Sequence, residues 1–148
     1  EAQLSLSQDQ LKRIFSKVDI IFLNQEEASF LTKVAFEKEA EIFKKIDEIC
    51  HGICVMTKGE EGVIVSDGKY LFSAMPDPKR IVVDTTGAGD SFASGFLSGY
   101  LRYNGDIVKS IQLGLANSAG NLSEVGAKTG LLNKKSEFER VEVKKNTL

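Results

Sequence analysis

The sequence predicts an α/β fold whose core is a mostly parallel sheet flanked by helices. Short apolar runs rich in β-branched residues alternate with longer segments in which apolar residues recur at helical spacing. A glycine-rich turn separates the last of these runs from a helix that is apolar nearly all round. The 148 residues are enough for one domain and too few for two. Strands that alternate with helices along the chain are typical of a layered α/β architecture.

The N-terminal part of the chain is predicted to contain three helices and one strand. Ser7 and Gln10 form a capping-box pattern ahead of an apolar stripe at helical spacing. Residues 18–23 (VDIIFL) form a short, nearly continuous apolar run, which is typical of a buried strand. A second helix is expected directly after Asn24, and the apolar spacing over residues 37–50 predicts a third.

The middle of the chain is predicted to form three strands. Residues 53–57 (ICVMT) and 62–66 (GVIVS) are apolar and rich in valine and isoleucine. Asp67-Gly68 then precedes residues 69–74 (KYLFSA), and this dipeptide between two strand-like runs is a strong hairpin signal. Residues 75–79 contain both prolines and are expected to form a loop.

The last part of the chain is predicted to contain a short strand, two helices and a charged tail. Residues 81–83 (IVV) form the expected strand, which ends at Asp84. Residues 92–101 are apolar nearly all round, and small residues on one side predict a helix buried against a sheet. The next helix is expected to begin at Ile107, with Asp106 as its cap. Beyond Gly130 the many lysines and glutamates indicate a partly ordered edge.

Composition excludes several functional classes. The formal net charge of −2 argues against a nucleic-acid binder, which usually carries a basic surplus. The chain lacks the apolar run of about 18 residues that a membrane span requires, and it shows no secretory signal pattern. Two cysteines make no disulfide framework, so a reducing cytoplasm is the expected location. Because the first residue is Glu1 rather than methionine, we expect that sequence has been removed upstream.

The most informative stretch is the glycine-rich turn DTTGAGDSF at residues 84–92. Gly87 and Gly89, on either side of the small Ala88, leave backbone N–H groups uncovered at the N-terminus of the following helix. Free donors at the positive end of a helix make an anion site. Asp90 would repel a phosphate bound there, so a carboxylate makes sense if a hydroxyl must be held beside the phosphate. Phosphoryl transfer needs this combination.

Other interpretations of the turn are weaker or remain open. The pattern of a P-loop is missing, and the dinucleotide pattern G-x-G-x-x-G is not met because the next glycine is Gly95. An oxidoreductase of the Rossmann type would need an acidic residue about 20 positions later, and Asp106 is better explained as a helix cap. The residues alone also allow a capped helix after a tight turn, with glycines serving only the geometry.

The run DTTGAGDSFASGF resembles the C-terminal signature of the ribokinase-like (PfkB) family of carbohydrate and nucleoside kinases. The resemblance covers most of residues 15–130 and implies a ribokinase-like, Rossmann-type layered sheet flanked by helices. Three further segments match the family in the expected order: NQEE at 24–27, TKGEEG at 57–62, and Asn117 with Gly126-Ala127.

The resemblance implies a catalytic role for the glycine-rich turn. Asp90 would be the base that orients the acceptor hydroxyl and takes its proton late, as the oxygen attacks the γ-phosphate of ATP. The backbone amides of Gly87, Ala88 and Gly89 would form the anion hole for the transferred phosphoryl group.

The resemblance also implies residues that bind ATP and metal ions. Glu27 would hold Mg²⁺ through water. Asp84 with Thr86 resembles the loop at which some members bind a monovalent cation such as K⁺, completed by backbone around Gly126. The residues expected to contact the nucleotide are Asn24, Thr57, Gly59, Gly62 and, on the adenine side, Asn117.

Each of these segments also has a purely structural interpretation. N-x-x-E after a strand is a plain capping box, and Asp84 could serve only to cap its turn. Asn117 could face solvent as a lone polar residue on an apolar helix. Cys50 and Cys54, close to His51, are too few and too cramped for a zinc site, and both are expected to be small core residues.

Family chains are about twice this long, and nothing here matches their N-terminal half, which carries the substrate contacts and the lid. Residues 1–148 are therefore expected to be the nucleotide-binding C-terminal part of a kinase that phosphorylates a sugar or nucleoside hydroxyl, inactive when alone. The alternative is a catalytically silent module that binds a nucleotide or anion. The resemblance is also compatible with a homodimer of the longer protein, and an unpaired sheet edge predicts association.

Overall fold

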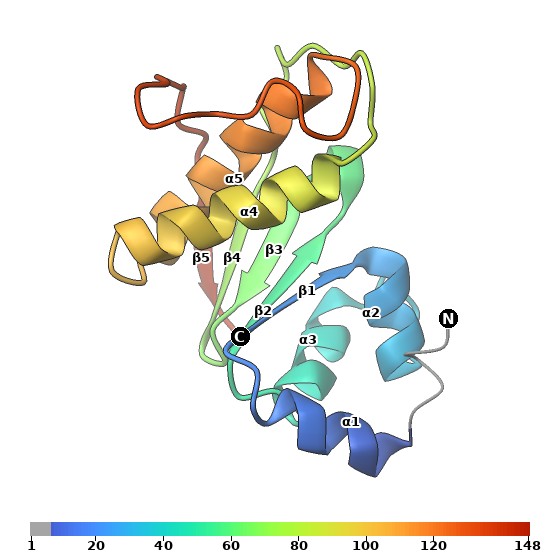
Figure 1. Cartoon of the computed structure of the whole chain (residues 1–148). Coiled ribbons are helices and arrows are strands. Elements are labelled where there is room, and N and C mark those ends of the chain that lie inside the picture. The colour runs from blue at the N-terminus through green and yellow to red at the C-terminus, as the bar shows by residue number, and fades with distance from the viewer. Residues whose placement is uncertain (1–6) are drawn as a thin grey trace. The chain divides into compact units, whose positions relative to one another are not determined.

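The computed structural model of the chain describes residues 7–148, which form two compact units (Figure 1). The first unit consists of residues 7–59, 63–73 and 145–148, and it holds three helices and nearly all of the sheet. The second consists of residues 60–62 and 74–144 and holds two long helices. Within residues 7–148, no helix combines the length and the apolar character needed to cross a bilayer.

The sheet has five strands in the order β1-β2-β3-β4-β5. β1 and β2 are parallel, whereas β2 and β3 are antiparallel. Residues 58–62, which join β2 to β3, are too short for the crossover that a parallel pair requires. The sheet is therefore mixed, which corrects the expectation of a mostly parallel one. The strands are β1 (Ile20–Asn24), β2 (Ile53–Thr57), β3 (Val63–Ser66), β4 (Tyr70–Ala74) and β5 (Lys144–Thr147).

Local signals define the helices of the first unit, which are α1 (Gln8–Phe15), α2 (Gln25–Thr32) and α3 (Glu39–Asp47). The predicted capping box of α1 is confirmed, because Ser7 Oγ accepts from the Gln10 amide at 3.3 Å and Gln10 Oε1 accepts from the Ser7 amide at 2.9 Å. This capping box satisfies amides at the start of α1 that have no partner inside the helix.

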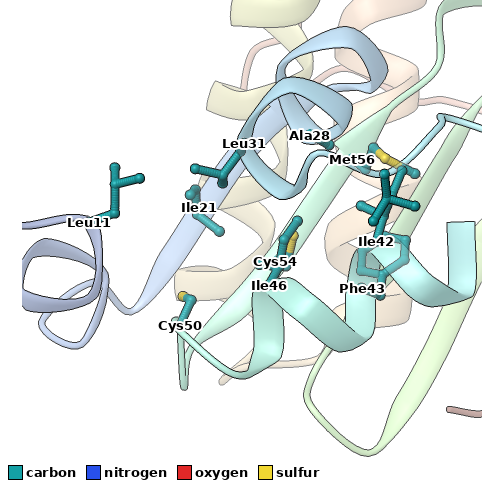
Figure 2. Packing of buried hydrophobic residues seen from close by; sticks show 11 residues of the cluster. Leu11, Ile21, Ala28, Leu31, Ile42, Phe43, Ile46, Cys50, Cys54 and Met56 are labelled. Atoms are coloured by element: carbon teal, nitrogen blue, oxygen red, sulfur yellow. The ribbon is translucent and has the colours of Figure 1, made fainter. Parts of the chain in front are cut away.

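One apolar core holds the first unit together (Figure 2). α3 contributes Ile42, Phe43 and Ile46, all fully buried, and β2 contributes Cys54 and Met56, which share one face of the strand. Cys50 and Cys54 are buried in the same cluster, which confirms that they are core residues. Burial also raises the pKa of the Cys54 thiol, so it stays protonated.

The second unit is built on helices α4 (Ala88–Arg102) and α5 (Ile107–Leu122). The small side of α4 faces α5 rather than the expected sheet: a Cβ on Gly95 would lie 2.8 Å from Asn117 Cβ, and one on Gly99 would lie 2.8 Å from Ser110 Cα. Glycines therefore allow the two helix backbones to approach closely. Asp106 caps α5 as predicted, since its Oδ1 accepts from the Lys109 amide at 3.0 Å.

Two segments of the chain differ from their predicted structure. Residues 81–83 form no strand, and their side chains are at least half exposed: Ile81 67%, Val82 50% and Val83 57%. Strand propensity was outweighed because the Val83 amide donates to the carbonyl of Leu122 instead of to a neighbouring strand. The charged tail, in contrast, ends in β5 at one edge of the sheet.

Candidate anion-binding turn

The glycine-rich turn leads directly into α4 in the second unit. Gly87 is the N-cap of this helix and has a left-handed backbone, with φ +82°. An added Cβ at Gly87 would lie 2.8 Å from both Cα and Cβ of Ala127. At Gly89 the same atom would meet nothing within 4 Å. Gly87 is therefore required by the turn itself, whereas Gly89 leaves the first turn of the helix open.

Backbone amides at this helix end are available to an anion. No side chain caps α4, and the amides of Gly89 and Asp90 lie in its first turn, where a helix supplies no acceptor. The Ala88 amide is already engaged, because it donates to the Thr85 carbonyl across 3.3 Å. The Asp90 side chain is exposed in the same turn. The arrangement combines free N–H donors with a carboxylate that solvent or a substrate hydroxyl can reach.

Asp84 fixes the turn to a segment far along the chain. One carboxylate oxygen accepts from the Thr86 amide at 2.9 Å, and the other accepts from the Gly126 amide at 2.9 Å. The amide and hydroxyl of Thr86, together with the Gly126 amide, hold the pKa of Asp84 below its ordinary value. Asp84 thus caps its own turn and also connects it to the loop after α5.

A monovalent cation fits this place only in part. The Asp84 carboxylate carries charge and has a spare lone pair on each oxygen. The Gly126 carbonyl, however, accepts from Asn121 Nδ2 at 2.9 Å, and it is also an acceptor for Thr129 Oγ1 at 2.8 Å. Thr129 has one hydroxyl proton, so the Gly126 carbonyl could serve as a ligand only with that proton turned to the Val125 carbonyl, 2.9 Å away.

Asn117 is buried. The interpretation that it faces solvent as a lone polar residue is therefore wrong. Its Nδ2 donates to the Ser91 carbonyl at 2.7 Å and to Ser94 Oγ at 3.3 Å, and its Oδ1 accepts from the Leu132 amide at 2.8 Å. Asn117 also lines an open groove of about 960 Å³ between α4, α5 and residues 131–134. Its amide therefore joins three segments of the second unit at the wall of this groove.

In the first unit, the carboxyl ends of two parallel strands bring predicted site residues together. Asn24 and Thr57 are the last residues of β1 and β2, and they are paired in the register. Asn24 caps α2 by accepting from the Glu27 amide at 2.7 Å, and Glu27 Oε2 accepts from the Asn24 amide at 2.8 Å. The capping-box interpretation is confirmed. Glu27 is exposed, and its second oxygen remains available to a hydrated cation such as Mg²⁺.

The two glycines after β2 differ in their surroundings. Gly59 is exposed at φ +58°, and a Cβ there would meet nothing within 4 Å. Gly62, at φ +89°, is buried, and a Cβ on it would overlap the Ala74 carbonyl. Gly59 therefore leaves its backbone open to a ligand, whereas Gly62 is required by the close approach of two backbone segments. Lys58, which lies between the end of β2 and Gly59, forms an ion pair with Glu39.

The predicted residues thus form one group in each unit. Asp84, Thr86 and the residues up to Asp90 share one turn with Asn117 on the adjacent helix, and Gly62 belongs to the same unit. Asn24, Glu27, Thr57 and Gly59 belong to the other unit. Sequence reasoning missed Asn121, which is fully buried and binds the loop that Asp84 holds. Its signal was a second asparagine one helical turn after Asn117.

Comparison with known proteins shows clear similarity. The model of a family described as "pfkB family carbohydrate kinase" matches residues 2–134. A cytidine kinase of Thermococcus kodakarensis is 39% identical over 123 residues, which are 80% of this chain and 42% of the relative.

Two solved structures share the fold. The adenosine kinase from Sinorhizobium meliloti is 30% identical with a TM-score of 0.71, over 81% of this chain and 36% of the other. The ribokinase of Arabidopsis thaliana, solved with ribose and ATP, is 25% identical with a TM-score of 0.68, over 78% and 38%. The chain therefore spans less than half of the length of each of these proteins.

Proposed function

Because the chain belongs to the pfkB family of carbohydrate kinases, we propose that it supplies the ATP-binding and proton-accepting part of such a kinase. The reaction transfers the γ-phosphate of ATP to a hydroxyl of a sugar or nucleoside. The relatives are named as kinases of cytidine, adenosine and ribose, so the proposed acceptor is a sugar or nucleoside.

The observation that carries the proposal is the open N-terminus of α4 beside Asp90. Uncapped first-turn amides at Gly89 and Asp90 offer donors to a phosphate, and Gly89 places no side chain over them. The exposed Asp90 carboxylate lies in the same helical turn. A site that only bound phosphate would gain nothing from a carboxylate there, whereas a transferase needs a group that orients and deprotonates the acceptor.

The proposed step is an in-line displacement at phosphorus. The acceptor oxygen forms a bond to the γ-phosphorus while the bond between that phosphorus and the β,γ-bridging oxygen breaks, and ADP leaves. The proton of the acceptor hydroxyl moves to the Asp90 carboxylate. The backbone amides of Gly87 and Gly89, with that of Ala88 once its long bond to Thr85 opens, stabilise the charge on the transferred group.

The first unit carries its own proposed nucleotide-binding residues. Asn24, Thr57 and Gly59 lie at the carboxyl ends of β1 and β2, which is where α/β sheets bind ligands. Glu27 would hold Mg²⁺ through water with its free carboxylate oxygen. When bound, Mg²⁺ neutralises phosphate charge. Gly62 and Asn117, in the second unit, are assigned to nucleotide binding by resemblance, and a monovalent cation at Asp84 and Thr86 is given no part in the reaction.

The chain alone is proposed to bind nucleotide without turnover. It spans 42% of the cytidine kinase and 38% of the ribokinase structure. We therefore propose that residues outside the matched part of those proteins supply contacts to the acceptor. Excluding water from the reacting phosphate also requires a closed site.

The test is calorimetric titration of the chain with the ATP analogue AMP-PNP and Mg²⁺, and separately with NAD. We expect binding of AMP-PNP and none of NAD. Gly89→Leu should weaken this binding, because the added side chain has room to fold over the amides, while Asn146→Leu at an exposed position of β5, which does not line the groove, serves as its control. Asp90→Asn should bind AMP-PNP at least as well as the parent. Absence of binding in a folded sample would overturn the proposal.

A further inference from the structure

Asn121 is a fully buried polar residue near the C-terminal end of α5. Its Nδ2 donates to the carbonyl of Gly126 at 2.9 Å and to the carbonyl of Thr129 at 3.1 Å. Its Oδ1 is buried and accepts no hydrogen bond from the residues that the structure describes. Burying a side-chain amide with one unsatisfied atom costs folding free energy. A function for its two hydrogen bonds would explain why such a residue is present.

The loop that Asn121 holds is the support of the anion-binding turn. The Gly126 amide donates to Asp84 at 2.9 Å, and the Cα and Cβ of Ala127 lie 2.8 Å from where a Cβ on Gly87 would be. One end of the loop therefore fixes the start of the turn, and its next residue fills the space beside the N-cap of α4. A displacement of this loop would displace both contacts.

Other contacts of the loop do not replace Asn121. The single proton of the Thr129 hydroxyl has two acceptors within reach, the carbonyls of Val125 at 2.9 Å and Gly126 at 2.8 Å, and both belong to neighbours in the same turn of chain. The backbones of Gly120 and Gly130 approach each other closely. The hydrogen bonds of the described residues include none between these two glycines. The Asn121 side chain is what ties the loop carbonyls to helix α5.

We propose that Asn121 is a positioning residue for the anion-binding turn. It holds residues 126–129 so that Asp84 and Gly87 keep the first-turn amides of α4 aimed at one point. Preorganised donors bind a developing charge without reorganisation, and small displacements of such donors lower binding and rate strongly. The inference rests on the proposed function of the turn, but its structural half can be measured without any ligand.

The experiment compares Asn121→Leu with a matched control, Ser123→Ala, in the 148-residue chain. Leucine has a similar size and removes both hydrogen bonds, whereas Ser123 is exposed two residues away and donates only locally, to the Gly120 carbonyl at 2.7 Å. Two readouts are needed: hydrogen exchange of the Gly126 amide, and the affinity for AMP-PNP with Mg²⁺. The Val55 amide in β2 and the Leu115 amide in α5 report whether the first and the second unit, respectively, stay folded.

We expect Asn121→Leu to accelerate exchange at Gly126 about tenfold and to weaken AMP-PNP binding at least about fivefold, with exchange at Val55 and Leu115 unchanged. Ser123→Ala should match the parent in both readouts. If Asn121→Leu does not fold, Asn121→Ser is judged by the same criteria, because serine is too short to reach both carbonyls.

The two proposals fail differently. If the parent chain binds AMP-PNP and the folded Asn121 variant binds it equally well, the positioning role is wrong although the proposed function stands. If the parent does not bind, the proposed function fails, and Gly126 exchange then decides alone. Unchanged exchange at Gly126 overturns the positioning role in either case.

Discussion

Asp84 Oδ2 lies 2.9 Å from the amide nitrogen of Gly126, a residue 42 positions further along the chain, and accepts its hydrogen bond. The bond joins the start of the glycine-rich turn to the loop after α5. With the two groups of Thr86 it keeps the carboxylate charged, which makes the contact sensitive to pH.

The first prediction concerns this pH dependence. Because the pKa of Asp84 is lower in the folded chain than in the unfolded one, its stabilising effect is complete above the unfolded pKa of about 3.9. The effect is lost as the pH falls through the folded value. Asp84→Asn should therefore lower the melting temperature at pH 7, and the difference from the parent should shrink toward pH 3. Asp19→Asn, at an exposed position, is the control, and an equal difference at both pH values would contradict the assignment.

The second prediction separates the two glycines of the turn. Gly87→Ala should destabilise the second unit by about 1–2 kcal/mol from its positive φ alone, and crowding against Ala127 adds to this. Gly89→Ala should be neutral or stabilising by up to about 1 kcal/mol, because alanine favours the helix and the space is open. Chemical denaturation of both variants measures this. Equal destabilisation by the two substitutions would show that the turn differs from the one described.

The third prediction separates the capping role of Asn24 and Glu27 from a role in binding Mg²⁺. Asn24→Ala should cost about 1 kcal/mol of stability, because it leaves the Glu27 amide without its acceptor. Glu27→Gln keeps an acceptor for the Asn24 amide, so stability should change little. The same variant should weaken AMP-PNP binding when Mg²⁺ is present and leave Mg²⁺-free binding unchanged. A large loss of stability in Glu27→Gln would indicate that the carboxylate serves the helix alone.

The fourth prediction concerns association through residues 81–83. These three consecutive β-branched residues are at least half exposed, and such an apolar patch favours self-association. We expect the chain to sediment with rising apparent mass as its concentration increases, and Val82→Lys to reduce this. Lys79→Ala, which adds no charge to the patch, is the comparison. A monomer at every concentration would contradict the prediction.

Features decided within one helical turn were predicted well from the sequence. The capping boxes at Ser7 and Asn24, and the Asp106 cap, depend on residues three positions apart and formed as expected. Strand β2 agrees with its predicted bounds because its apolar run is fully buried. These signals are local, so distant contacts did not override them.

Features decided by distant partners were predicted poorly. Residues 81–83 have strong strand propensity but lack a neighbouring strand to pair with among the described residues, and Val83 binds Leu122 instead. The exposure of Asn117 depended on which side of α5 meets α4, and the sequence alone does not state this. Strand β5 (KKNT) was not predicted as a strand because its residues carry no apolar alternation, and it forms by pairing at the sheet edge. For the anion turn, the glycines were found in the sequence, but the support from Asn121 was not.

The occupied N–H donors of Asn117 have a consequence for the choice of phosphate donor. Both of its N–H donors are used by α4, and its oxygen already accepts from Leu132. A purine placed in the adjacent groove would therefore find no free N–H donor on Asn117, which by itself gives little means of distinguishing adenine from guanine. Any strong preference between ATP and GTP has to come from the other polar side chains that line the groove, among them Asn133 and Lys134.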